Sequence, residues 1–139
     1  MRQGLVPGIE VEFQILVEPS MRPAFDGKVV HDVMSTVTMI YYMEKAGREI
    51  IVPYLEDGEE GAGFAIDVKH VGLALVGQEV KFKAVCTEVS EKRVVCEVKA
   101  ETDRHVVGIG LFTQAIFQKQ DMERRIRELK ESLLRRKNL

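Results

Sequence analysis

The stretch TVTMIYYMEKAGREIIVPYLEDGEEGAGFAIDVKHVG, residues 36–72, contains two different hydrophobic repeats, one before and one after a proline. From about Val33 to Val52, apolar or small side chains recur every three or four residues, which predicts one long helix. Pro53 cannot donate into a helix and restricts the residue before it, so it ends this helix. A loop, residues 55–61, then leads into residues 62–72, which alternate as a strand does.

The flanking sequence supplies more strands. Residues 9–17 alternate apolar and polar side chains, which indicates a half-buried strand, and residues 18–28 hold two prolines and a glycine, which predict a loop or lid. Further strands are predicted at 79–89, 93–102 and 105–118. A turn through SEKR joins the first two of these strands as a hairpin.

A strand, a long helix and then four antiparallel strands describe an α+β domain whose sheet wraps a central helix. Residues 121–136 add a charged segment with one apolar stripe at helical spacing, formed by Met122, Ile126, Leu129 and Leu133. We therefore expect a domain over residues 1–120 and a C-terminal amphipathic helix over residues 121–139. This helix is expected to pack on its own domain or on a second subunit.

The overall composition excludes several classes of function. The chain has 139 residues, 45% hydrophobic and 30% charged, and a formal net charge of −2, so it fits one globular domain without a field that would attract nucleic acid. No apolar run is long enough for a membrane span, and the N-terminal residues lack the pattern of a secretion signal. These features predict a cytoplasmic protein without a membrane partner.

The two cysteines, Cys86 and Cys96, fall on the same side of the predicted hairpin and could face one another. In a reducing compartment we expect buried, reduced thiols, with a disulfide as the alternative. Two cysteines without a matching histidine spacing offer too few ligands for a metal, and none is expected.

Glu44 stands out because it lies in the middle of the helical stripe. That stripe consists of Val33, Val37, Ile40, Glu44, Gly47 and Ile51. A carboxylate there loses hydration unless a partner replaces it, which is one way proteins prepare a carboxylate for acid, base or nucleophilic work. The alternative is a solvated glutamate at the edge of the stripe.

Thr36 and His70 are the other candidate functional residues. Thr36 precedes Glu44 by eight residues, so the two side chains lie on neighbouring stripes of the helix. His70 shares strand parity with Phe64 and Ile66 and should face the helix with them. Alternatively, Thr36 or Ser35 caps the helix, and His70 is a hydrogen-bonded core residue.

Residues 36–72 resemble the core of the fluoroacetyl-CoA thioesterases and their hotdog-fold relatives. That family places a threonine at the start of the central helix, a glutamate eight residues later, a PYL-acidic-glycine segment, and a histidine on the next strand. Thr36, Glu44, Pro53-Tyr54-Leu55 and His70 match this pattern without gaps. The resemblance implies a hotdog fold, an antiparallel sheet wrapped around a long central helix.

The same resemblance implies catalytic roles for Thr36, Glu44 and His70, and substrate contacts for Gly63 and Phe64. Two departures from the family are visible. The lid over residues 18–30 is shorter, and Gln114 replaces the family's basic residue on the last strand. We therefore expect thioester hydrolysis with an open choice of acyl group.

In the expected reaction, Glu44 attacks the thioester or activates a water, Thr36 orients the reacting groups, and His70 assists proton transfer. Thr36 as the nucleophile stays an alternative. The resemblance also implies a homodimer, or a higher oligomer, with the site at the subunit interface. No cofactor is expected, and CoA is part of the substrate, its phosphates met by bases such as Lys69 or Arg104.

Two other functions share these features. A noncatalytic acyl-CoA-binding or regulatory module would hold a thioester without hydrolysing it. A hydratase or dehydratase would act on the acyl chain beta to the thioester. Release of free thiol separates the thioesterase from both.

Overall fold

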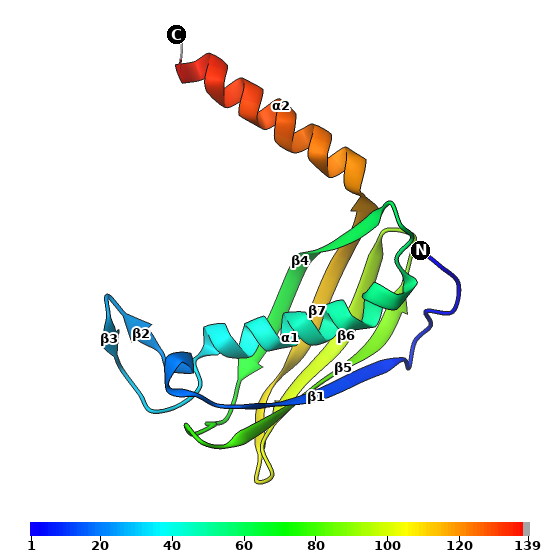
Figure 1. The fold of residues 1–139 in the computed structure, drawn as a ribbon. Coiled ribbons are helices and arrows are strands. Elements are labelled where there is room, and N and C mark those ends of the chain that lie inside the picture. The colour runs from blue at the N-terminus through cyan, green and yellow to red at the C-terminus, as the bar shows by residue number, and fades with distance from the viewer. Residues whose placement is uncertain (138–139) are drawn as a thin grey trace.

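The computed structural model describes residues 1–137 and has a five-stranded antiparallel sheet that curves around one long helix (Figure 1). The elements are β1 (Glu10–Leu16), η1 (Pro19–Met21), β2 (Ala24–Phe25), β3 (Lys28–Val29), α1 (Thr36–Ile51), η2 (Val52–Tyr54), β4 (Glu59–His70), β5 (Glu79–Val89), β6 (Arg93–Glu101), β7 (Val106–Gln118) and α2 (Lys119–Lys137). The strand order is β1-β5-β6-β7-β4, so β1 and β4 form the two edges. The predicted α+β architecture is confirmed.

The core lies between α1 and the concave face of the sheet. Every second residue of β5 and β6 is buried there, namely Val80, Phe82, Ala84, Cys86, Val94, Cys96, Val98 and Ala100. Cys86 and Cys96 are register partners, as predicted, and both are free thiols. Burial raises the pKa of the Cys96 thiol to about 12, so it stays protonated and unreactive.

Helix α1 buries a face that overlaps only in part with the predicted stripe. Gly47 and Ile51 are buried as predicted, but Val37 is 78% exposed. In the first turns of the helix, Met39 and Met43 face the core instead, so the stripe is displaced there by one residue, roughly 100° around the helix axis. The cause is the pair of methionines, whose long, flexible side chains fill the core. Gly108 on β7 makes room for them, because a Cβ there would collide with the Met39 sulfur.

The segment between β1 and α1 is a short lid that carries the hairpin β2–β3. Asp26 and Gly27 form its turn with φ angles of 53° and 79°, values that suit a glycine. Arg22 fastens the base of the lid. It donates to the Pro19 carbonyl at 2.9 Å and pairs with Asp32, also at 2.9 Å.

Helix α2 extends away from the sheet (Figure 1), and none of its described residues is buried. Its contacts within the chain lie mainly at the end of β7. The expected packing of α2 on its own domain is therefore wrong, and its apolar stripe faces solvent in a single copy. No helix described in residues 1–137 is both long and apolar enough for a membrane crossing.

Candidate active site

The first half of the site forms where the start of α1 meets the end of β4. Ser35, not Thr36, caps the helix, because its side chain accepts a hydrogen bond from the Thr38 amide at 3.0 Å. This leaves the Thr36 hydroxyl available to His70. The Thr36 Oγ1 lies 2.8 Å from Nδ1 of His70.

His70 faces α1 because it follows the alternation of β4. Val68 and His70 pair in register with Gly110 and Gly108 on β7. Within the described residues, the His70 Nε2 is buried and has no hydrogen-bond partner. If Nδ1 carries the ring proton, it donates to Thr36, and Nε2 is left as a free base. If Nε2 carries the proton, Thr36 donates to Nδ1, and Nε2 is left as a free acid.

The Thr36–His70 pair opens into a pocket of about 360 Å³. Its lining consists of Pro23, His31, Val33, Met34, Ser35, Thr36, His70, Val71, Gly72 and Leu73. Five of these side chains are apolar, and four, those of His31, Ser35, Thr36 and His70, are polar. This is the composition of a site that holds an apolar group beside reactive ones.

Glu44 lies away from this pocket, and the expectation that it is buried in the helical stripe is wrong for a single copy. Its side chain is exposed, because it sits on the flank of α1 beyond the buried methionines. The carboxylate lies against Gly63 of β4. A Cβ added to Gly63 would be 3.4 Å from the Glu44 Oε1, an ordinary van der Waals distance, so the carboxylate and Gly63 are direct neighbours.

An ion pair one turn further along holds α1 to β4 beside Glu44. Arg48 makes two hydrogen bonds to Glu60, of 2.8 and 3.2 Å. The Arg48 guanidinium lowers the pKa of the Glu60 carboxyl to about 2, helped by a hydrogen bond from the Gly61 amide. The pair of Arg48 and Glu60 therefore steadies the helix turn that carries Glu44.

Gln114 anchors the same turn from beneath. It is 2% exposed, and its Nε2 donates to the Gly47 carbonyl at 2.9 Å. A Cβ on Gly47 would collide with Phe112, so this glycine allows α1 to approach β7 closely. Gln114 also pairs in register with Gly63. Gln114 thus contributes to the position of Glu44.

The structure brings Thr36 together with His70, and Glu44 together with Gly63, but it does not join the two pairs within one copy. Thr36 and Glu44 are two helical turns apart, about 12 Å along α1. Gly63 and His70 are separated by much of β4, roughly 20 Å of strand. Among the described residues, no hydrogen bond links one pair to the other.

Phe64 does not share the face of His70. The register of β4 against β7 shifts between Gly63 and Ala65, so Phe64 is the extra residue of a bulge. Its ring lies 4.2 Å from the guanidinium carbon of Arg93 and is 62% exposed. The predicted parity of Phe64 with His70 is wrong because a bulge cannot be read from simple alternation.

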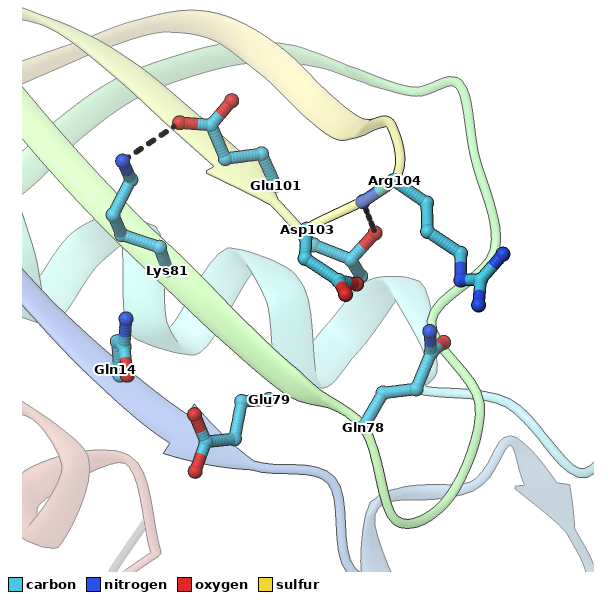
Figure 2. Close-up of a pocket in the computed structure, with 8 residues that line it drawn as sticks. Gln14, Gln78, Glu79, Lys81, Glu101, Asp103 and Arg104 are labelled. Atoms are coloured by element: carbon cyan, nitrogen blue, oxygen red, sulfur yellow. Dashed lines mark hydrogen bonds and ion pairs between the residues drawn. The ribbon is translucent and has the colours of Figure 1, made fainter.

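A second pocket, of about 510 Å³, lies away from these residues at a corner of the sheet (Figure 2). Its Lys81 is paired with Glu101 at 3.1 Å, and Arg104 extends away from that pair. Glu79 and Asp103 add negative charge to the same pocket. Lys69 and Arg104 are both absent from the lining of the pocket that holds Thr36 and His70. The sequence-based suggestion that they meet CoA phosphates therefore gains no support.

Comparisons with known proteins agree with this fold. The family model described as fluoroacetyl-CoA-specific thioesterase matches residues 17–120. The fluoroacetyl-CoA thioesterase of Streptantibioticus cattleyicolor is 29% identical over 97 residues, 70% of each chain.

Solved structures give the same result. A hypothetical protein of Thermus thermophilus, described as a thioesterase superfamily member, has 35% identity and a TM-score of 0.90 over 94% of this chain and 97% of its own. The fluoroacetyl-CoA thioesterase FlK has 24% identity and a TM-score of 0.84 over 91% of this chain and 98% of its own, a likeness of fold. The hotdog fold and the thioester hydrolase class are confirmed, and the chain belongs to the fluoroacetyl-CoA-specific thioesterase family.

Proposed function

We propose that the chain hydrolyses the thioester of an acyl-CoA at two sites shared by a homodimer. Each site combines Thr36 and His70 of one copy with Glu44 and Gly63 of the other. One observation carries the proposal: Gly63 lies near the middle and His70 at the end of β4, which is an open edge of the sheet.

An open edge of this length favours pairing with an identical edge. β4 has 12 residues, and in a single copy its outer backbone groups have no strand beside them. Two identical edges related by a twofold axis pair antiparallel. With the axis between the two copies of Asp67, Ala65 lies opposite the partner's Lys69, and the bulge at Phe64 brings Gly63 opposite the partner's His70. This register brings each Glu44–Gly63 pair to the Thr36–His70 pair of the other copy.

The apolar surface beside β4 supports the same interface. Val37, on the flank of α1 that carries Glu44, is 78% exposed, and Phe64, on the other face of β4, is 62% exposed. Ile66, at 37%, continues this surface toward the middle of the strand. Apolar side chains gathered along a free strand edge are typical of a surface that a second subunit covers.

The proposed chemistry follows from this arrangement. Glu44 attacks the thioester carbonyl to form a mixed anhydride that water then hydrolyses, or it activates a water that attacks the carbonyl directly, and Gly63 lies beside its carboxylate. His70, oriented by Thr36, delivers a proton to the leaving thiolate through Nε2. The acyl group occupies the apolar pocket beside His70. A mutant of FlK, a protein of the same fold, has been crystallised in complex with fluoroacetate and CoA.

The test is thiol release from a panel of short, branched and aromatic acyl-CoAs, with His70→Ala as the matched control for background hydrolysis. The proposal predicts release of free CoA from at least one member, with the wild type faster than His70→Ala by about a hundredfold. Binding of acyl-CoA without thiol release would favour the noncatalytic module instead. Light scattering tests the dimer separately, and a monomer that still turns over would refute the shared site.

A further inference from the structure

We propose that α2 of each copy reaches across the shared edge and covers the apolar rim of the partner's Thr36–His70 pocket. The occupant of the apolar stripe on α2 is therefore a second copy of this chain. This inference rests on the dimer proposed above. It adds a cover over the pocket, which is provided by α2 and not by α1 or the sheet.

The apolar stripe on α2 has the pattern of a helix face that packs against another surface. Met122, Ile126, Leu129 and Leu133 follow one another at spacings of four, three and four residues, which aligns them on one face. Their side chains are 38% to 68% exposed in a single copy. The opposite face carries charged residues such as Arg127 and Glu131. A helix with one apolar face and no cover in its own chain needs a partner.

The starting point of α2 determines which part of the partner it meets. Gln118, the last residue of β7, pairs with Glu59, and the Lys119 amide donates to the Gly58 carbonyl at 2.8 Å. The helix thus begins beside the first residue of β4. In the proposed register, that position lies next to the segment around the partner's Ala74. Figure 1 shows α2 running out on the side where β4 forms the sheet edge.

The segment at that place is apolar and exposed. Val71, Leu73 and Leu75 are 56%, 60% and 52% exposed, and the first two line the pocket that holds His70. Phe25, at the tip of the lid, is 71% exposed. At 1.5 Å per residue, the 19 residues of α2 span about 28 Å, enough to cross such a rim. In the proposed dimer, the apolar stripe of α2 would cover the apolar rim of the partner's pocket, so neither surface would remain exposed to solvent.

Cross-linking between full-length variants that each carry one added surface cysteine tests the contact. Leu129→Cys protein is mixed with Leu73→Cys protein under mild oxidation after the subunits have exchanged. Glu131→Cys, on the opposite face of α2, replaces Leu129→Cys in the matched control. Cys86 and Cys96 are buried, so they give little background. The inference predicts a disulfide-linked heterodimer from the Leu129→Cys mixture, at least several-fold above the Glu131→Cys mixture.

Three outcomes would overturn the inference. The first is equal cross-linking of the two mixtures in a protein that light scattering shows to be dimeric, which leaves the dimer and the hydrolase intact. The second is preferential linkage of Leu129→Cys to itself, which would instead indicate paired α2 helices. The third is a monomer, which removes the proposed dimer as well.

A second measurement uses charge-neutral double variants of the full chain. Ile126→Gln with Leu129→Gln removes apolar contacts, and Arg127→Gln with Glu131→Gln is the control, since it removes one charge of each sign from the opposite face. We expect the first pair to remain dimeric and to raise KM several-fold for an aliphatic acyl-CoA, with kcat changed less. The control should match the wild type. An unchanged KM in the first pair would overturn the covering role of α2.

Discussion

The hydroxyl of Thr36 lies 2.8 Å from Nδ1 of His70, although the two residues are 34 positions apart in the chain. Ser35 makes this possible, because it caps α1 and leaves the neighbouring hydroxyl unused by the helix. The bond fixes the ring of His70 and directs Nε2 away from Thr36.

Thr36→Ala should lower kcat by about tenfold to a hundredfold, because His70 loses the bond that orients its ring. Thr36→Ser keeps the hydroxyl and should recover most of the rate. Single-turnover thiol release measures both, with circular dichroism to check the fold. Equal loss in the serine and alanine variants would contradict a role for the hydroxyl.

Glu44→Gln should slow the chemical step by roughly two to four powers of ten, because the amide is a poor base and nucleophile. The fold should survive, since the side chain is exposed in a single copy and the amide is nearly isosteric with it. Binding of acyl-CoA, followed by calorimetry, should persist. Glu49→Gln, on the same helix, is the control and should keep the wild-type rate. A folded Glu44→Gln protein with the wild-type rate would show that the carboxylate is not catalytic.

Gln114→Leu should lower the free energy of unfolding by about 1–2 kcal/mol, because the Gly47 carbonyl loses a buried partner. It should also lower the rate of thiol release, since the turn of α1 that carries Glu44 loses its anchor. Denaturant unfolding provides the first measurement. Gln14→Leu, on the exposed side of β1, is the control and should change stability by less than about 0.5 kcal/mol. Equal effects of the two substitutions would refute the anchoring role.

The Arg48–Glu60 pair predicts a specific dependence of stability on pH. The folded state lowers the pKa of Glu60 to about 2 from an ordinary value of 4.5. Its contribution is therefore fully present above pH 4.5 and disappears as the pH falls toward 2. Because both side chains are partly exposed, the contribution is small, at most about 1 kcal/mol.

Unfolding of the wild type and of Arg48→Gln between about pH 2 and 7 measures this contribution. The difference in free energy of unfolding between the two proteins should be constant at neutral pH and should shrink below pH 4.5. Arg104→Gln is the control, and its difference from the wild type should not close over this range. If Arg48→Gln is still less stable than the wild type by the same amount at the acid end of the range, the difference does not come from Glu60.

Much of the fold could be predicted because alternation and helical spacing record which side chains are buried. The hairpin of β5 and β6, with Cys86 opposite Cys96, follows from strand parity alone. The buried face of α1 was mispredicted because Met39 and Met43, rather than the branched residues, fill the core. The bulge at Phe64 also escaped prediction, because one extra residue in a strand leaves no mark in its composition.

The candidate site could be predicted only in part. Family spacing indicated Thr36, Glu44, His70 and Gly63, but no local pattern shows that they form two separate pairs. Arg48–Glu60 and Gln114–Gly47 were missed because each joins residues that are distant in sequence. The four-residue spacing of Glu44 and Arg48 suggests an ion pair within the helix, whereas Arg48 pairs with Glu60 of β4.

The central claim, a site shared between two copies, is tested most directly by mixing two inactive variants. Glu44→Gln and His70→Ala homodimers are combined, allowed to exchange subunits, and assayed for thiol release. Each heterodimer would contain one site with an intact Glu44 and an intact Thr36–His70 pair, so random exchange should restore about one quarter of wild-type activity. If exchange is complete, as judged by mass-tagged subunits, and activity remains at the level of the separate variants, the site lies within one copy and the shared arrangement is wrong.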